Sequence, residues 1–182
     1  KIKKFKKMIK FVYQNNPKGT GDAVLKTKNL IKDKYFLMLL PDDLIIKKNC
    51  SKDMILIHNK NKCSVMASMR VQKKTINRWG IYSKKNNINK NNFYINDVVE
   101  KPDIKSAPSN NAVIGRYILP KKIFKKLQNQ KKGKGGEIHI TDSIRRLIKD
   151  GETFVGHNFK GKYLDCGTMD GYINSSIEIS KI

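Results

Sequence analysis

The sequence predicts an α/β domain built on a largely parallel sheet with helices on both faces. The run from Phe36 to Leu40 is continuously apolar and ends at Pro41, which is typical of a strand buried on both faces. Elsewhere, strand-like and helix-like segments alternate without an internal repeat or an obvious linker. With 182 residues, the chain is expected to form one domain, residues 1–182, that is large enough to bury a core.

The first part of the chain is expected to begin with a strand at residues 9–13, where apolar side chains cluster. A tight loop at residues 17–21 then leads into a helix over residues 22–31. The buried strand at residues 35–40 follows this helix. Ser51 is a favourable N-cap, so we expect the next helix to run from there to about residue 61.

The middle of the chain is predicted to be mainly β-structure. Residues 64–71 alternate weakly between apolar and polar side chains and are expected to form a strand. Residues 93–100 alternate like a strand and stop before Pro102. Residues 79–82 begin a further β region. The Lys- and Asn-rich stretch 84–92 is expected to be a hairpin loop or a mobile insertion.

The last third of the chain is predicted to return to alternating strands and helices. A strand at residues 112–119 precedes Pro120, which favours a helix start and predicts a helix over residues 121–128. Thr141 or Asp142 is expected to cap a helix that ends near residue 149. The remaining segments are expected to be a flexible loop at 131–136, strands at 153–159 and 162–164, and a helix from Thr168 onward.

The strong positive charge does not by itself indicate a nucleic-acid-binding protein. Lys and Arg total 39 against 15 Asp and Glu, which gives a formal net charge of +24. Only five of these cations are Arg, the side chain that contacts bases in a bidentate manner, and no basic helix or lysine–aromatic stripe occurs. Lys, Asn and Ile all have AT-rich codons, so genome composition is sufficient to produce this bias with no function attached. We therefore expect no nucleic-acid partner.

Cysteine usage and hydropathy indicate a cytoplasmic protein. Cys50, Cys63 and Cys166 are odd in number and form no CxxC pair, which argues against a zinc site or a disulfide framework and fits reduced thiols. No apolar run approaches the length of a membrane span, so no membrane partner is expected.

Two acidic motifs predict a site for a hard metal ion. Asp42 and Asp43 directly follow the buried strand, at the sheet edge where α/β proteins place their ligands. Asp165 is a second acid at a strand end, and it would either cap the following helix or complete a metal site with Asp42. Such oxygen ligands suit Mg²⁺, which binds through one or two carboxylates and substrate phosphates. The alternative for Asp42 is an ordinary turn, since Pro-Asp favours turns anywhere.

A glycine-rich junction predicts a nucleotide cradle. Gln14 is followed by Lys18-Gly19-Thr20-Gly21 between a strand and a helix, where glycines permit close approach of backbone N–H groups to a ligand. The Gln14 amide can donate and accept hydrogen bonds at the same time, which suits the edge of a base. An ordinary strand-to-helix turn would carry the same residues.

Glu100 and Lys101 place a carboxylate and an ammonium group at another strand end. Lys101 can bind a phosphate as a point charge and Glu100 can accept hydrogen bonds from sugar hydroxyls, whereas a surface ion pair is the alternative. The segment 133–137 would either close over a ligand or simply connect two elements. The histidines show no ligand-like spacing and are expected to be structural: His58, His139 and His157.

In their order along the chain, these motifs resemble those of a known enzyme family. The series comprises Gln14 with 18–21, then the segments 40–43, 79–81, 99–102, 108–119, 135–142 and 163–167. It resembles the sugar-nucleotide pyrophosphorylases and, especially in segments 115–119 and 135–142, bacterial UTP–glucose-1-phosphate uridylyltransferase. The resemblance extends from about residue 11 to residue 179.

The resemblance implies a Rossmann-like nucleotide-diphospho-sugar transferase fold with a mixed, mostly parallel sheet. It implies that UTP and glucose 1-phosphate form UDP-glucose and pyrophosphate, by in-line attack of the sugar phosphate on the α-phosphate. Such chemistry depends on positioning and charge neutralisation, which agrees with the lack of a Ser/His or Cys/His arrangement. A homodimer or homotetramer is also implied. A thymidylyltransferase and a catalytically silent sugar-nucleotide-binding homologue are the alternatives.

The resemblance also implies roles for individual residues. Asp42 and Asp165 would hold Mg²⁺, and Lys101 would neutralise the sugar phosphate, so these three form the expected catalytic set. Asp43 would support the loop or contact the metal. The nucleotide would contact Gln14, Gly19, Thr20 and Asp42, and the glucose pocket would be lined by Gly80, Glu100, Lys101, Gly115 and Glu137.

Several positions depart from the family pattern. Asp22 stands where relatives often have His, and Trp79 where Tyr is usual, and neither is expected to change the chemistry. Met169 replaces a frequent Lys, so no cationic contact is expected there. No Gly-rich, Arg- and Lys-bearing triphosphate loop precedes the motifs. The chain is therefore expected to be incomplete at its N-terminus, to expose an unpaired sheet edge and apolar surface, and to be poorly active alone.

Overall fold

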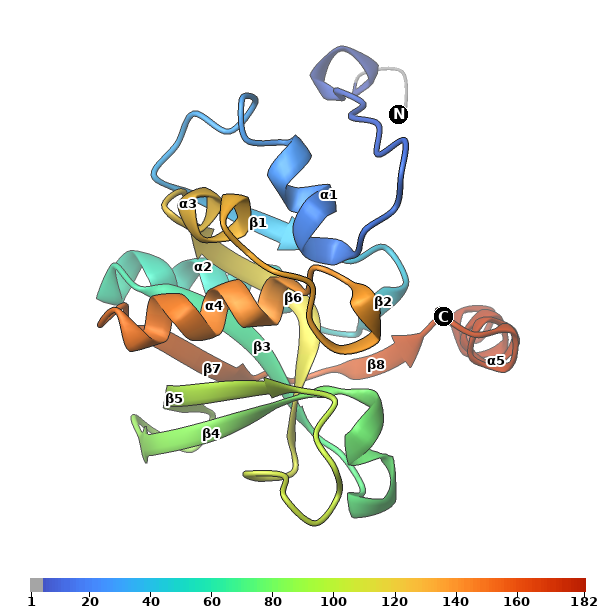
Figure 1. Cartoon of the computed structure of the whole chain (residues 1–182). Coiled ribbons are helices and arrows are strands. Elements are labelled where there is room, and N and C mark those ends of the chain that lie inside the picture. The colour runs from blue at the N-terminus through green and yellow to red at the C-terminus, as the bar shows by residue number, and fades with distance from the viewer. Residues whose placement is uncertain (1–4) are drawn as a thin grey trace.

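The chain folds into a six-stranded sheet flanked by helices, with a two-stranded sheet beside it (Figure 1). This computed structural model describes residues 5–182. The strands are β1 (Tyr35–Leu39), β2 (Asp43–Ile46), β3 (Ser64–Arg70), β4 (Gly80–Asn87), β5 (Asn92–Glu100), β6 (Asn111–Pro120), β7 (Phe154–Asn158) and β8 (Lys162–Asp165). The helices are α1 (Thr20–Lys26), α2 (Cys50–Asn61), α3 (Ile123–Gln128), α4 (Ile140–Lys149) and α5 (Met169–Ile179), with 3₁₀ turns η2 (Lys6–Met8), η3 (Lys73–Arg78) and η4 (Lys134–Gly136).

The large sheet is mixed, with the strand order β1-β6-β3-β7-β5-β4. The prediction of an α/β fold with a mixed sheet is confirmed, but the expectation that most strands pair in parallel is wrong. Among the described strands only β3 and β7 pair in parallel, and the other neighbours pair antiparallel. The reason is that β6 lies between β1 and β3 and runs against both, while β4 and β5 form a hairpin.

Helices cover both faces of the large sheet, as predicted. On one face, α1, α3 and α4 bury Val24, Leu127 and Ile144 in an apolar cluster with inward-facing strand residues. On the other face, α2 contributes Cys50 and Met54 to a second cluster. Burial of a large apolar side chain contributes about 1.5–3 kcal/mol. These two clusters therefore hold the strand ends, and the loops that leave them, in fixed positions.

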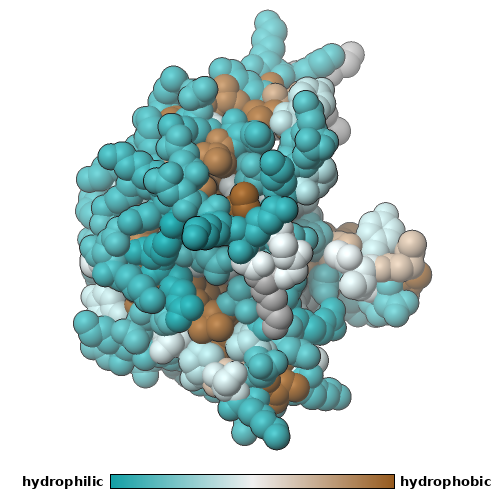
Figure 2. Space-filling view, viewed as in Figure 1, coloured by the Kyte–Doolittle hydropathy of each residue, from teal (hydrophilic) through white to brown (hydrophobic). Residues whose placement is uncertain are grey.

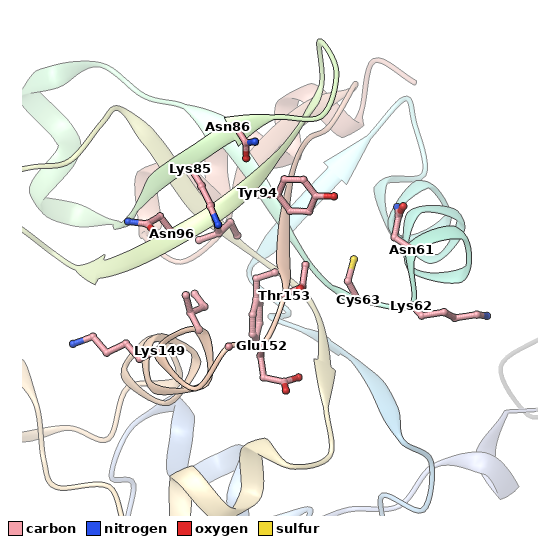
Figure 3. A pocket seen from close by; sticks show the side chains of 14 residues that line it. Asn61, Lys62, Cys63, Lys85, Asn86, Tyr94, Asn96, Lys149, Glu152 and Thr153 are labelled. Atoms are coloured by element: carbon pink, nitrogen blue, oxygen red, sulfur yellow. The ribbon is translucent and has the colours of Figure 1, made fainter.

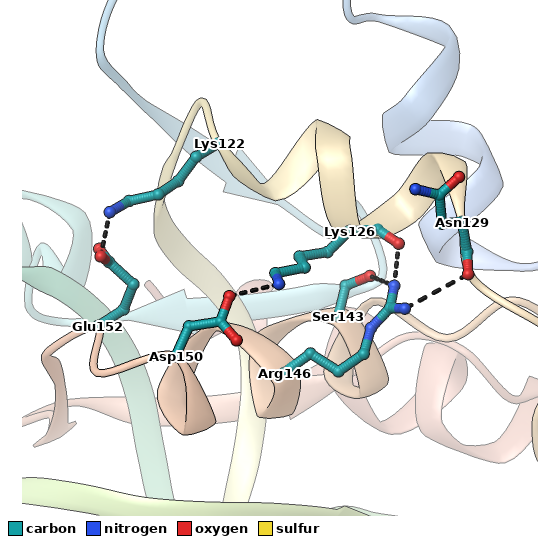
Figure 4. Close-up of polar contacts among 7 residues, drawn as sticks. All are labelled: Lys122, Lys126, Asn129, Ser143, Arg146, Asp150 and Glu152. Carbon is teal, nitrogen blue, oxygen red and sulfur yellow. Dashed lines mark hydrogen bonds and ion pairs between the residues drawn. The ribbon is translucent and has the colours of Figure 1, made fainter.

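Polar contacts join α3 to the end of α4 (Figure 4). Lys122 pairs with Glu152 and Lys126 pairs with Asp150. The Arg146 guanidinium donates a hydrogen bond to the carbonyl oxygen of Lys126. Ion pairs with exposed partners contribute about 0–1 kcal/mol, so the apolar contacts between these helices provide most of their packing energy.

Two predicted strands near the N-terminus differ from expectation. Residues 9–13 are irregular and pair with no strand in the described part of the chain, and Phe11 and Tyr13 are each 80% exposed. The strand β1 is present, but it is not buried on both faces, since Leu39 is 50% exposed. The reason is that β1 is an edge strand, paired with β6 on one side. Among the described residues no strand pairs with the other side of β1, and Leu37 and Leu39 are exposed there.

Most other elements lie where they are predicted, with shifted ends. The helix α1 ends at Lys26 rather than near residue 31. The cap of α2 is Asn49 instead of Ser51, because the Asn49 side chain accepts a hydrogen bond from the Lys52 N–H at 3.0 Å. The residue before α4 is His139, not Thr141 or Asp142.

The β-structure around the acidic motifs is more extensive than predicted. The strand β2 has no counterpart among the predicted elements, and it pairs antiparallel with β8 so that Asp43 lies opposite Asp165. The hairpin of β4 and β5 is confirmed, although its strands extend into the stretch 84–92. Thr168 caps α5 as expected, accepting a hydrogen bond from the Gly171 N–H at 3.1 Å.

Hydrophilic side chains cover most of the face shown in Figure 2. The helix α5 is an exception, since it stands at the end of β8 away from the large sheet and exposes Tyr172, Ile173 and Ile177 (Figures 1 and 2). Across residues 5–182, no helix combines the length and the apolar character that a membrane span requires.

Candidate functional site

A cavity of about 310 Å³ gathers most of the predicted site residues. Its walls come from the start of α1, the loop after β1, the start of β4, the end of β5, the middle of β6 and the segment before α4. The predicted residues in these walls are Thr20, Asp42, Gly80, Glu100, Lys101, Gly115 and Glu137. They are spread over more than half of the sequence, so strand pairing and helix packing are what bring them together.

The β4–β5 pair forms one wall of the cavity. Gly80 lies opposite Glu100 in the ladder, and a Cβ at position 80 would lie 3.2 Å from Glu100 Oε2. The Thr141 hydroxyl donates a hydrogen bond to the same oxygen at 2.8 Å and so orients the carboxylate. Lys101 has a positive φ of 45°, which is uncommon for a residue with a side chain, and its N–H donates to the Trp79 carbonyl oxygen at 3.0 Å. The wall therefore presents a fixed carboxylate next to a lysine.

The acidic loop after β1 is anchored through Asp43. Its Oδ2 accepts a hydrogen bond from the Gly115 N–H at 2.7 Å, and its Oδ1 accepts one from the Tyr163 hydroxyl. The Arg116 guanidinium donates to two carbonyl oxygens of the same loop. Burial raises the pKa of Asp43, while the hydrogen bonds from Tyr163 and Gly115 act against that shift. Because both of its carboxylate oxygens accept hydrogen bonds within the protein, Asp43 supports the loop. Asp42 and Asp43 both line the cavity.

Asp42 and Asp165 converge on a small space beside Gly167. A Cβ at position 167 would lie 3.0 Å from Asp42 Oδ2 and 3.3 Å from Asp165 Oδ1. Arg78 lies 3.7 Å from the other oxygen of Asp165. Within residues 5–182 there is no group of three or more His, Cys, Asp or Glu side chains that would hold a metal ion. Two carboxylates still match Mg²⁺, which completes its shell with phosphates and water.

Gln14 and Gly19 lie beside the cavity and are not part of its walls. A Cβ at Gly19 would lie 2.9 Å from the Ile138 carbonyl oxygen and 3.0 Å from Glu137 Cβ, and its φ is +103°. Both the close approach and the positive φ require glycine. The Gln14 amide nitrogen donates to Asp22 Oδ2 at 2.5 Å and to the Gly19 carbonyl oxygen at 3.3 Å. The predicted nucleotide cradle, formed by Gln14 and residues 18–21, thus packs against the cavity wall that carries Glu137.

Several cavity residues are absent from the sequence-based prediction. They include Arg78, Tyr117, His139 and Thr141. His139 is predicted to be structural, yet it is buried in the cavity wall with its Nδ1 4.0 Å from Glu137 Oε2. His139 and Thr141 lie inside the motif at 135–142, so that motif is the signal that points to them. Arg78 and Tyr117 have no comparable signal in the sequence.

A larger cavity of about 790 Å³ contains none of the predicted site residues (Figure 3). It lies between the end of α2, the β4–β5 hairpin and the turn after α4. Lys62, Lys85 and Lys149 line it together with Asn86 and Asn96. Volume alone therefore does not select the candidate site; the smaller cavity is the candidate because carboxylates, a lysine and glycines converge there.

Known proteins resemble this chain in sequence and in fold. Residues 1–181 match the family model described as nucleotidyl transferase. A UTP–glucose-1-phosphate uridylyltransferase of Pseudomonas aeruginosa is 38% identical over 169 residues, which cover 91% of this chain and 60% of that protein. A UTP–glucose-1-phosphate uridylyltransferase 2 of Streptococcus pyogenes serotype M3 is 34% identical, with coverages of 93% and 58%.

The crystal structure of a UDP-glucose pyrophosphorylase complexed with UDP-glucose has a TM-score of 0.89 to this chain and is 38% identical. The match covers 94% of this chain and 66% of that one. The chain thus spans 58–60% of the length of these two curated relatives.

Proposed function

Because the chain belongs to the nucleotidyl transferase family, we propose that it forms UDP-glucose and pyrophosphate from UTP and glucose 1-phosphate. The observation that supports this most is the cavity in which the expected sugar-binding residues meet beside two acidic strand ends. Because relatives are named uridylyltransferases, we propose UTP, and not a thymidine nucleotide, as the substrate of this chain.

The glucose moiety is proposed to occupy the cavity of about 310 Å³. Glu100, whose Oε2 is oriented by the Thr141 hydroxyl, would accept hydrogen bonds from sugar hydroxyls. Lys101 follows on the same wall and would neutralise the phosphate of glucose 1-phosphate as a point charge. Gly80 keeps the pocket open, because a side chain there would project toward Glu100 and Thr141, and Gly115 lets the acidic loop pack closely against β6. Glu137 would close the pocket from the opposite side.

The reaction depends on holding two anions in line. An oxygen of the sugar phosphate attacks the α-phosphate of UTP, and pyrophosphate leaves with the electron pair of the bond that breaks. The attacking phosphate oxygen is already anionic, so no general base is needed to remove a proton from it. The residues of this chain would therefore act by positioning and by charge neutralisation, with the Asp43 network fixing the acidic loop.

We propose that Asp42 and Asp165 hold Mg²⁺. Their carboxylate oxygens converge beside Gly167, where the glycine leaves space that a side chain would fill. When bound there, Mg²⁺ would offset the negative charge of the phosphates. Arg78, in an ion pair with Asp165, would keep that carboxylate oriented.

The proposed enzyme would work in the cytoplasm as a homodimer or homotetramer. The three cysteines are free thiols, as expected in a reducing compartment, and the assembly follows from the family resemblance alone. Light scattering of the purified protein would measure the assembly directly, and a monomer would contradict this part of the proposal.

Calorimetric titration with UDP-glucose, with and without Mg²⁺, tests the site. Mg²⁺ is expected to strengthen binding at least about tenfold, and Asp42→Asn and Asp165→Asn should each remove that dependence. The matched control is Asp150→Asn, which removes a carboxylate whose ion pair with Lys126 lies between α3 and α4. Pyrophosphate release from UTP and glucose 1-phosphate then measures turnover.

Two other outcomes would identify a different protein. Binding of UDP-glucose without Mg²⁺ dependence and without turnover indicates a silent sugar-nucleotide-binding homologue. Steeply salt-dependent binding of a polyanion that UDP-glucose does not displace indicates a nucleic-acid-binding domain.

A further inference from the structure

Asp22 is a buried acid that the proposed reaction does not use. It lies in the first turn of α1 and is only 6% exposed. Acidic side chains are rarely buried to this degree unless a specific partner holds them. The partner here is the Gln14 amide nitrogen, which lies 2.5 Å from Asp22 Oδ2.

Two acceptors determine which way the Gln14 amide points. Asp22 Oδ2 and the Gly19 carbonyl oxygen both face its nitrogen, and neither a carboxylate nor a carbonyl oxygen can donate a hydrogen bond. The nitrogen carries two protons, so these two bonds use both of them. A reversed amide would place its oxygen against two acceptors and lose both bonds.

The orientation leaves Gln14 Oε1 as the group available to a ligand. Among residues 5–182, no donor forms a hydrogen bond with this oxygen. Gln14 therefore presents an acceptor only, although a glutamine side chain is in general able to donate as well.

We propose that Asp22 is a positioning residue that selects the base by holding Gln14 as a hydrogen-bond acceptor. This inference rests on the proposed function, in which Gln14 faces the base. Uracil and thymine carry a proton on N3 that can be donated to Gln14 Oε1. The N3 atom of cytosine has no proton, so it would meet Gln14 Oε1 as acceptor against acceptor. The acid at position 22, expected from the sequence to leave the chemistry unchanged, thus narrows the choice of base.

A histidine at this position, as in the related family pattern, would constrain Gln14 less. A neutral imidazole has one donor and one acceptor nitrogen, so it can bond either end of an amide. The carboxylate of Asp22 can only accept hydrogen bonds, so it restricts the orientation of the Gln14 amide more than a histidine would.

The test compares the affinities of UDP-glucose and CDP-glucose for the unmodified protein and for Asp22→Asn. Asparagine keeps the shape of Asp22, but its amide can donate to Gln14 Oε1 as well as accept from the Gln14 nitrogen. The Gly19 carbonyl oxygen, at 3.3 Å, is then the one acceptor of the two that still favours the original orientation. The measurement is made on this 182-residue chain and on any longer polypeptide that contains it. Because both ligands are titrated into the same preparation, the ratio of affinities does not change if part of the variant is unfolded.

We expect the unmodified protein to prefer UDP-glucose by about tenfold or more, and Asp22→Asn to reduce that preference at least about fivefold. Gln14→Ala should reduce it similarly, and adding Asp22→Asn to Gln14→Ala should change it no further. Asp150→Asn, at the C-terminal end of α4 and paired with Lys126, should leave the preference intact.

The outcomes separate this inference from the proposed function. If the unmodified protein prefers UDP-glucose and Asp22→Asn keeps the full preference, the role of Asp22 is wrong while the proposed function stands. If the unmodified protein binds UDP-glucose without preferring it over CDP-glucose, the role of Asp22 is likewise wrong. If it binds neither ligand, the proposed function fails, and this inference fails with it.

Discussion

Replacing Gly115 with Ala should displace the acidic loop after β1 and weaken the binding of UDP-glucose. A Cβ at this position would lie 2.3 Å from Asp43 Oδ2, 2.6 Å from Leu40 Cβ and 2.7 Å from Leu40 Cγ. Unstrained contacts between heavy atoms are about 3.5 Å or longer, so the loop would have to move by roughly 1 Å. Leu40 Cβ is joined directly to the backbone and cannot rotate away.

The size of the effect follows from two contributions. Overpacking of this kind costs about 1–3 kcal/mol. Loss of the hydrogen bond from the Gly115 N–H to Asp43, 2.7 Å long, removes a bond to a charged group, worth about 1.5–3 kcal/mol. Movement of the loop relieves the overpacking but breaks the hydrogen bond, so the two costs do not simply add. We expect the free energy of unfolding to fall by about 3 kcal/mol.

The same displacement should be visible in ligand binding. An error of roughly 1 Å in the position of a functional group can lower a reaction rate by about 10²-fold. We take this as the upper bound for binding, so the affinity for UDP-glucose should fall by about 10- to 100-fold. Urea unfolding with linear extrapolation measures the stability, and calorimetry measures the affinity.

Gly151→Ala is the matched control for this experiment. Gly151 has a φ of +90° and no heavy atom within 4 Å of an added Cβ. Its replacement should cost about 1–2 kcal/mol through backbone strain alone and leave the affinity unchanged. A Gly115→Ala protein with near-normal stability and normal affinity would refute the argument that this close approach positions the loop.

Two further predictions concern the sheet and the helix layer. His157 Nδ1 bonds Asn92 Oδ1 at 2.7 Å and its Nε2 is buried without a partner in the described structure, so burial lowers its pKa below the usual 6.5 despite the opposing charge of Asp53. As the pH falls, His157 is therefore protonated in the unfolded chain before it is protonated in the folded chain. The free energy of unfolding should then fall as the pH drops below about 7, by at most about 1.4 kcal/mol per pH unit. His157→Gln should flatten that slope in urea titrations between pH 5.5 and about 7.5, and an unchanged slope would contradict the assignment. Glu152→Gln breaks the ion pair with Lys122 shown in Figure 4. It should lower the free energy of unfolding by less than about 1 kcal/mol, and by still less in about 1 M salt. A larger, salt-independent loss would show that this ion pair contributes more stability than its exposure suggests.

Short-range patterns in the sequence were sufficient to predict where most elements lie, whereas the resemblance to a known family predicted which residues meet in the cavity. Glu100 ends a strand because Pro102 follows it, and Thr168 caps a helix because its hydroxyl reaches the Gly171 N–H. The acids, the lysine, Gly19 and Gly80 occur at such ends, where side chains or backbone are available to a ligand, whereas Gly115 lies in the middle of β6. Their order along the chain was enough to indicate the family.

Long-range pairing decided the rest. The parallel majority expected for the sheet was wrong because β6 inserts between β1 and β3, and no local pattern states which strands become neighbours. The same pairing leaves β1 at an edge with Leu39 half-exposed, although its apolar run resembles that of a central strand. Hydrogen bonds between residues far apart in sequence assigned Asp43 to the loop and left Gln14 with one free acceptor. Composition and spacing thus determine which groups are available, whereas their orientation depends on partners that only the folded chain brings within bonding distance.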